Sequence, residues 1–163
     1  MKEVVIVSAC RTAIGTFGGT LRDVPAVNIA GASMKGAIEK AGIETDMIDD
    51  VRYGCCLEPY HAFNVSRISS LLAGVPESCN AVTINRACIS GMEAVISGMA
   101  FIQSGLAEII LAGGIEHMSG TPYAVCDARW GVKIQGTTFD DVMMSKPVAE
   151  PVNCALVIEA CTR

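Results

Sequence analysis

The sequence is poor in aromatic and charged side chains and has no cluster of basic residues. Of its 163 residues, 5% are aromatic and 18% are charged, and the formal net charge is −5. The 12 lysines and arginines are scattered, so the chain lacks the basic surface that binds nucleic acid or an anionic membrane. The longest apolar run near the start, residues 4–7, is too short for a signal peptide or a membrane span. These absences predict a cytoplasmic protein with neither nucleic acid nor a membrane as partner.

The chain also lacks the residue spacings of a structural metal site. No two cysteines have Cys-x-x-Cys spacing, and the only histidines are His61 and His117, so no metal is expected. The eight cysteines would suggest disulfides in a secreted protein, but without a signal sequence we expect them to stay reduced. For most of them a core position is the simplest interpretation, because a free cysteine behaves as a small hydrophobic residue.

Aliphatic and small residues are abundant instead. The sequence is 51% hydrophobic with 16 glycines, and its mean hydropathy of +0.43 is high for a chain of this size. Its length suffices for one domain with a substantial core. Because large exposed apolar patches are rare on monomers, we expect part of the surface to be buried against another domain or subunit.

Apolar patterns predict alternating strands and helices. The clearest helix, residues 26–41, repeats apolar residues at three and four spacing and ends before Gly42. The predicted strands are residues 4–7, 49–54, 81–84 and 108–112, and the other predicted helices are residues 65–73 and 88–103. This alternation predicts a layered sheet with right-handed crossovers. After residue 118 the pattern becomes irregular, until residues 154–158 give one more candidate for a buried strand.

The most informative segment is residues 84–94, which reads Ile-Asn-Arg-Ala-Cys-Ile-Ser-Gly-Met-Glu-Ala. It places Cys88 at the first turn of a long predicted helix. The partial positive charge of a helix N-terminus lowers the pKa of a thiol, which makes it a better nucleophile. The backbone N–H groups of Ile89, Ser90 and Gly91 are candidate donors to the oxyanion that forms when sulfur attacks a carbonyl. The alternative is a cysteine buried at the start of a core helix.

Several segments, in order, resemble the thiolase family. Residues 84–94 resemble the motif of its acyl-accepting cysteine, Val-Asn-Lys/Arg-x-Cys-small-Ser-Gly-Leu/Met-Lys/Gln/Glu-Ala. The other matching segments are residues 5–19, 64–67, 73–76, 128–131 and 112–119, of which the last resembles the family's Gly-Gly-x-Glu-x-Met-Ser motif. The resemblance covers about residues 3–144, and several ordered motifs are far more specific than one.

The resemblance implies the fold of the N-terminal half of a thiolase. That fold is layered α/β, with a mixed, mostly parallel five-stranded sheet and helices on both faces, here with the loop domain largely absent. Residues 3–118 would form the core, residues 119–151 a shortened loop region and residues 152–163 a possible final strand of the core. Cys88 matches the family's nucleophile. The residues that match its structural motifs are Asn85, Gly113, Gly114, Glu116, Met118 and Ser119.

Two departures from the family pattern bear on function. The family has a small residue after the cysteine, whereas this chain has the β-branched Ile89. More importantly, the motifs of the family's second half, Cys-x-Gly-Gly-Gly, Gly-His-Pro and Asn-Glu-Ala-Phe, have no match. In the family these motifs carry the activating histidine, the second cysteine and an oxyanion site. His117 does not replace that histidine, because it lies in a structural motif.

The resemblance implies an acyltransferase that uses coenzyme A thioesters as substrates and needs no permanently bound cofactor. Cys88 would form an acyl-thioester in Claisen condensation or thiolysis, and the isolated chain would be inactive. The expected partners are acyl-CoA substrates and further copies of the chain, a second subunit that carries the C-terminal thiolase half, or both.

Three alternatives remain open at this stage. They are a chain truncated from a full-length enzyme, a condensing subunit of the ketoacyl-synthase type, and a non-catalytic protein that keeps the half-fold as a docking platform. Among secondary candidates, we interpret Glu116 as a buried hydrogen-bonding anchor, His61 as an exposed loop residue, and Gly113 with Gly114 as a close-packing turn.

Overall fold

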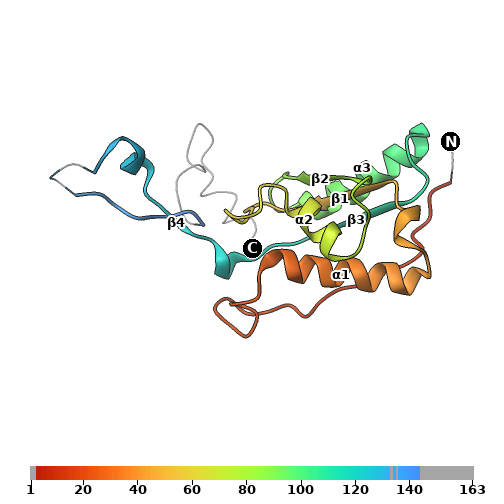
Figure 1. The fold of residues 1–163 in the computed structure, drawn as a ribbon, viewed down its shortest axis with the longest axis horizontal. Coiled ribbons are helices and arrows are strands. Elements are labelled where there is room, and N and C mark those ends of the chain that lie inside the picture. The colour runs from red at the N-terminus through yellow and green to blue at the C-terminus, as the bar shows by residue number, and fades with distance from the viewer. Residues whose placement is uncertain (1–2, 133, 135, 144–163) are drawn as a thin grey trace. The chain divides into compact units, whose positions relative to one another are not determined.

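The computed structural model describes residues 3–132, 134 and 136–143. They form two compact units, of which the first runs to Gly120 and the second begins at Thr121 (Figure 1). The final strand that the sequence predicts within residues 152–163 lies outside the described residues, as does the end of the predicted loop region.

A parallel three-stranded sheet forms the centre of the first unit. Its strands are β1 (Asp50–Gly54), β2 (Asn80–Ile84) and β3 (Ile110–Gly114), and their order is β2-β1-β3. Gly54 pairs with Ile84 on one side and with Gly114 on the other. The three carboxyl ends are therefore level, and the segments that leave them start along one edge of the sheet.

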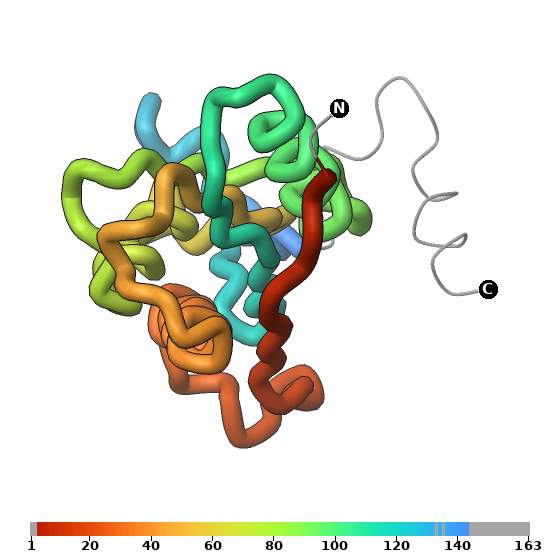
Figure 2. The backbone as a smooth tube through the Cα atoms, turned by 90° about the vertical axis from the view of Figure 1, so that its right-hand side faces the viewer, coloured from red at the N-terminus to blue at the C-terminus, as the bar shows by residue number. Residues whose placement is uncertain are grey.

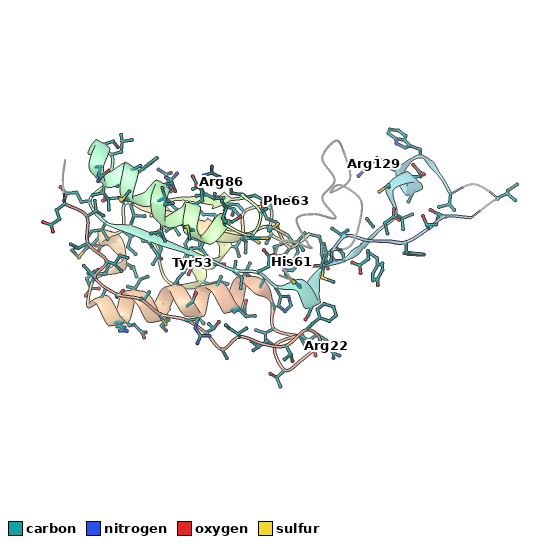
Figure 3. All side chains as sticks on the ribbon, turned by 180° about the vertical axis from the view of Figure 1, so that it is seen from behind. Arg22, Tyr53, His61, Phe63, Arg86 and Arg129 are labelled. Carbon is teal, nitrogen blue, oxygen red and sulfur yellow. The ribbon has the colours of Figure 1, made fainter. Side chains whose placement is uncertain are left out.

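Helices cover both faces of this sheet. Helix α1 (Ala26–Ala41) packs against α2 (Val65–Leu72) on one face, and α3 (Ser90–Ser104) lies along the other (Figure 1). Alternation along β1 accounts for this arrangement, because successive side chains point to opposite faces. Val51 and Tyr53 join the core with α1, and Figure 3 shows Tyr53 between the sheet and that helix.

Between the sheet and α3 there are fewer buried apolar side chains and more polar ones. Arg52 forms an ion pair with Asp50 at 2.7 Å and donates to Ser97 at 3.0 Å. Its guanidinium carbon also lies 3.9 Å from the centre of the Phe101 ring. By contrast, the face under α1 holds Met34 and Val51, both fully buried. Most of the described apolar core therefore lies between the sheet and α1.

Local signals account for the helix ends. Helix α1 stops at Gly42, which adopts a left-handed conformation with φ of 66° that a residue with a side chain adopts at a cost. Helix α2 starts after Asn64, whose side chain accepts a hydrogen bond from the Arg67 N–H at 3.0 Å, as a helix N-cap does. The predicted helix at residues 26–41 is confirmed with the same bounds, and the helix at 65–73 ends one residue earlier.

Two predicted boundaries need correction. Helix α3 begins at Ser90, not Cys88, because Ala87 has a left-handed φ of 51° and breaks the helical path just before the cysteine. Strand β3 begins two residues after the predicted start and continues through Gly113 and Gly114 instead of stopping before them. Strands β1 and β2 are confirmed to within one residue.

The predicted strand at residues 4–7 is wrong for the described structure. This segment has no strand partner among the described residues. Side chains attach the two residues that follow it to α1: the Ser8 hydroxyl donates to Ala37 O at 2.8 Å, and Lys40 Nζ donates to Ala9 O at 3.1 Å. A β-branched run favours a strand, but a strand also needs a neighbour with which to pair.

The second unit contains little regular structure in its described part. Strands β4 (Tyr123–Ala124) and β5 (Asp140–Asp141) pair antiparallel. Between them lies a short 3₁₀ helix, Cys126–Trp130. Two further 3₁₀ turns, Thr45–Met47 and Met118–Gly120, belong to the first unit.

Glycines allow the start of α3 to touch the sheet. A Cβ atom at Gly54 would lie 2.5 Å from the Gly91 nitrogen and 2.6 Å from the Ser90 oxygen, and one at Gly114 would lie 3.3 Å from the Gly91 Cα. At Gly113 a Cβ would meet the ring of Tyr53 at 2.6 Å. Gly113 and Gly114 thus act in close packing, as the sequence suggested, but within strand β3 and not in a turn.

We expect Gly54→Ala to lower the free energy of unfolding by about 1–3 kcal/mol, because the added methyl group overlaps backbone atoms that cannot rotate away. Urea unfolding followed by circular dichroism measures this loss. Gly91→Ala is the matched control: its Cβ meets nothing within 4 Å, and alanine is favoured over glycine in helices by up to about 1 kcal/mol. Equal stability of the two variants would contradict the close contact.

Candidate active site

The candidate site lies at the carboxyl edge of the sheet. β1 leads into Cys55 and Cys56, β2 leads into Asn85, and β3 leads through Ile115 to Glu116. Parallel α/β sheets bind their ligands at this edge, because the loops that leave adjacent strands meet there.

Residues 85–90, which we call the nucleophile turn, are held in one conformation by their own side chains. The buried Ser90 hydroxyl accepts a hydrogen bond from the Arg86 N–H at 2.8 Å and donates one to Ala87 O at 2.6 Å. The Asn85 side chain donates to Cys56 O at 2.9 Å and accepts from the Ala87 N–H at 3.1 Å. These bonds offset the cost of the left-handed Ala87, which is about 1–2 kcal/mol for a residue with a side chain.

Cys88 is exposed on this turn and directly precedes Ile89, the N-cap residue of α3. Two of the three backbone groups predicted as oxyanion donors take part in forming the turn. The N–H of Ile89 donates to Arg86 O at 3.3 Å, and the N–H of Ser90 donates to Ala87 O at 3.1 Å. Both N–H groups therefore help to shape the turn, and the oxyanion role expected of Ile89, Ser90 and Gly91 stays a prediction.

Glu116 joins the exits of β3 and β1. Its carboxylate accepts hydrogen bonds from the Cys56 N–H at 2.9 Å and the Leu57 N–H at 3.0 Å, and lies 4.0 Å from the Cys55 sulfur. This is the contact pattern of an anchor. The residue is exposed, however, and not buried as the sequence suggested.

The cysteines near this edge differ in environment. Burial, and to a smaller extent the charge of Glu116, raises the pKa of Cys55 to about 12. The same two causes, followed by the neighbouring Cys88, raise the pKa of Cys56. Burial is also the largest cause of the raised pKa of Cys79. Cys88 is exposed.

The remaining motif residues hold neighbouring loops together. The Ser119 hydroxyl accepts a hydrogen bond from the Gly18 N–H at 2.9 Å, and His117 Nε2 lies 3.1 Å from Leu21 O. Both contacts attach the loop before α1 to the segment after β3, where Met118 is half-exposed. His61 is exposed and stacks edge-on against Tyr60 with ring centres 5.1 Å apart, and Figure 3 shows where it lies. Across the described residues no group of three or more possible metal ligands is found.

Sequence reasoning missed two features of the site. It did not identify Cys56 as a neighbour of the nucleophile turn, since nothing in the loop after β1 signals contact with Asn85. It also assigned Ser90 a role through its backbone, whereas its side chain does most of the positioning. Because the left-handed conformation of Ala87 cannot be recognised from the sequence, the serine three residues later gives only a weak signal of this role.

The family comparison agrees with this arrangement. The family model described as thiolase, N-terminal domain, matches residues 4–157. The chain belongs to the thiolase family. The match covers nearly the whole sequence and includes the nucleophile turn and the Gly-Gly-x-Glu-x-Met-Ser motif.

Among similar proteins, the acetyl-CoA acetyltransferase of Syntrophomonas wolfei is 42% identical over 145 residues, covering 87% of this chain and 37% of that protein. The acetyl-CoA acetyltransferase of Cupriavidus necator is 38% identical over 144 residues, covering 88% of this chain and 37% of that protein. A crystal structure of the Bacillus anthracis acetyl-CoA acetyltransferase superposes with a TM-score of 0.82 at 39% identity, covering 85% of this chain and 35% of that one. The chain thus spans somewhat more than a third of the length of these thiolase relatives.

We expect iodoacetamide to alkylate Cys88 before Cys55 and Cys79, because Cys88 is exposed whereas burial protects the other two and raises the pKa of both. Peptide mapping after brief labelling measures the order. Cys10 and Cys126 are also exposed and control for exposure alone, so a nucleophile at Cys88 should react faster than either. Labelling at Cys55 while Cys88 stays intact would show that the assignment is wrong.

Proposed function

We propose that this chain carries the acyl-accepting half of a thiolase active site, with Cys88 as the nucleophile. The observation that carries the proposal is the exposed Cys88 on a turn fixed by Asn85 and Ser90, in a chain of this family. The named relatives are acetyl-CoA acetyltransferases, which supports acyl transfer between coenzyme A thioesters as the reaction.

The proposed reaction has two steps. The Cys88 thiolate attacks the carbonyl carbon of an acyl-CoA, a sulfur–carbon bond forms, and coenzyme A leaves as a thiolate that takes up a proton. The carbanion of a second acyl-CoA then attacks the acyl-cysteine, forms a carbon–carbon bond and releases the Cys88 thiolate. Thiolysis is the reverse. This scheme of nucleophilic catalysis needs a base near the sulfur, and we propose that a complementary thiolase half supplies it. No permanently bound cofactor is required.

The outward face of α3 is where we propose that this second half docks. Ile89, Met92 and Ile96 recur at three and four spacing, and their side chains are 50%, 66% and 47% exposed. A helix that is apolar on all sides is normally buried. This stripe begins beside Cys88, so a domain that covers it reaches the nucleophile.

A membrane is the other environment that buries an apolar helix. Of the described residues, only the stretch Ala87–Ser104 is long and apolar enough to cross one, judged by length and composition alone. Core helices of globular proteins meet the same criterion. Because one side of α3 packs on the sheet through Ala94 and Gly98, we favour protein as the cover and propose a cytoplasmic, oligomeric assembly.

We expect Cys88→Ser to lower acyl transfer about a thousandfold or more in the assembled enzyme, because removing a covalent nucleophile abolishes most of the rate enhancement. Acetoacetyl-CoA thiolysis measures the loss. Cys126→Ser, at an exposed cysteine of the second unit, is the matched control and should keep the wild-type rate. Turnover by Cys88→Ser at the wild-type rate would rule out the mechanism.

We also expect the chain alone to be inactive and to associate with itself. Its described part exposes an apolar helix face, and each Å² of apolar surface left in water costs about 25 cal/mol. Light scattering and a thiolysis assay of the purified chain test both points. Adding a polypeptide that carries the C-terminal half of a thiolase should restore activity. A monodisperse monomer that cleaves acetoacetyl-CoA would contradict the proposed division of the site.

A further inference from the structure

The side chain of Cys56 lies on the same side of the sheet as α3, because side chains alternate along β1 and its exit. Three alternate residues belong to the apolar cores on the side of α1: Val51, Tyr53 and Cys55. Between them, Arg52 donates to Ser97 of α3, and Gly54 contacts the start of that helix. Cys56 is the next residue in this second series. Figure 2 shows the two helices on opposite sides of the sheet, the orange α1 below and the green α3 above.

Two contacts bring Cys56 close to Cys88. A Cβ atom at Gly54 would lie 2.6 Å from the Ser90 oxygen. Cys56 lies two positions after Gly54, and Cys88 lies two positions before Ser90. The Asn85 side chain makes the second contact: it donates to Cys56 O at 2.9 Å and accepts from the N–H of the residue before Cys88 at 3.1 Å.

The exits of neighbouring strands have the spacing that a disulfide requires. Cys56 follows β1 and Cys88 follows β2, and these strands pair in parallel with Gly54 opposite Ile84. Adjacent strands lie about 4.7–4.9 Å apart, and the Cα atoms of disulfide-bonded cysteines are about 4.4–6.8 Å apart. A bond between the two sulfurs is therefore compatible with the sheet as it stands.

The two thiols differ in their exposure to a reagent. Cys88 is exposed, whereas Cys56 is half-buried. Burial, then the charge of Glu116 and last the charge of Cys88 raise the pKa of Cys56. Because peroxides react with the thiolate of an accessible cysteine, they should oxidise Cys88 first and leave Cys56 beside it as a thiol.

We propose that Cys56 is the resolving thiol of Cys88, that is, the thiol that attacks the oxidised sulfur of Cys88 and closes a disulfide. The pair would then be a site of reversible oxidation by a peroxide. As regulation of the acyl-accepting sulfur this inference rests on the proposed function, whereas the formation of the disulfide does not.

The proposed oxidation has two steps, with hydrogen peroxide as the oxidant. The Cys88 thiolate attacks one peroxide oxygen, a sulfur–oxygen bond forms, and the oxygen–oxygen bond breaks. The hydroxide that leaves takes up a proton, and Cys88 becomes a sulfenic acid. The Cys56 thiolate then attacks the Cys88 sulfur, a disulfide forms, and the sulfenic oxygen leaves as hydroxide, which takes up a proton. The two sulfurs lose two electrons in total and the peroxide gains them.

A thiol with a raised pKa suits the second step. Because Cys56 is mostly protonated near neutral pH, it is a poor first target for the oxidant. Its place beside Cys88 offsets the small thiolate fraction, since an attack within one chain has a high effective concentration. Cys55 does not fit this role, because it is buried in the core and has its pKa raised to about 12.

The disulfide would protect the nucleophile from permanent damage. A sulfenic acid that finds no thiol is oxidised further to sulfinic and sulfonic acids, which dithiols do not reduce. A disulfide, by contrast, returns to two thiols by exchange with a dithiol. Acyl transfer that depends on Cys88 would thus stop during oxidation and resume after reduction.

Peptide mapping of the full-length chain after brief treatment with hydrogen peroxide tests the proposal. We expect a disulfide between Cys56 and Cys88 as the main product at Cys88, within one chain, at a yield independent of protein concentration, and removed by dithiothreitol. Cys10 and Cys126 are also exposed and control for exposure alone, so neither should join Cys56. Any other main product at Cys88, including its unmodified thiol, a sulfinic acid or a bond between two copies, overturns the proposal.

A pair of variants identifies the resolving sulfur, because Cys55 and Cys56 are adjacent in one peptide. Cys56→Ser should abolish the disulfide and raise the yield of the Cys88 sulfinic acid at least about fivefold. Cys55→Ser is the matched control and should keep the disulfide. A disulfide that survives Cys56→Ser, or that is lost only in Cys55→Ser, contradicts the assignment. If circular dichroism shows that either variant is unfolded, fragment masses of the wild-type peptide, which separate the two sulfurs, decide.

These readouts are masses, so they distinguish a failure of this inference from a failure of the proposed function. Wild-type turnover by Cys88→Ser in the assembled enzyme would rule out Cys88 as the nucleophile without bearing on the disulfide. A missing disulfide would rule out the resolving role of Cys56 and leave the proposed acyl transfer at Cys88 as it stands.

Discussion

The contact between the start of α3 and the ends of β1 and β3 is the constraint on which the site depends. Gly54 and Gly114 leave no side chain between the sheet and the backbone of Ser90 and Gly91, so the nucleophile turn rests directly on the carboxyl edge. At the same edge the Asn85 side chain donates to Cys56 O and the Cys56 N–H donates to Glu116, so the exits of all three strands are joined. The position of Cys88 thus depends on two glycines that have no functional group of their own.

The same edge distinguishes one thiol from its neighbours. Glu116 anchors the loop after β1 by accepting two backbone hydrogen bonds, and this places its negative charge beside Cys55 and Cys56. Burial, with a smaller contribution from that charge, raises the pKa of both thiols and favours their protonated, poorly nucleophilic form near neutral pH. The two cysteines beside the exposed Cys88 are therefore weaker competing nucleophiles.

Elements whose stability is encoded locally could be predicted from the sequence, and those that depend on distant contacts could not. Helix α1 has a complete apolar period and a glycine stop, and its bounds were predicted without error. The start of α3 was misplaced because the left-handed Ala87 donates to the Asn85 side chain and accepts from the Ser90 hydroxyl, and no periodicity records these hydrogen bonds. Residues 4–7 have the composition of a strand, but pairing requires a second segment, and none of the described residues supplies it. Cys88 could be proposed as the nucleophile from the sequence because the motif around it is contiguous.

Helix α3 exposes one continuous apolar face. Met92, Val95, Ile96 and Met99 recur at three and four spacing and are 66%, 44%, 47% and 42% exposed. This face begins at Ile89, which directly follows Cys88. Because Cys88 is itself exposed, a partner that covers this face would also close the site around the proposed nucleophile, so the same apolar contact would provide both docking and access to the sulfur.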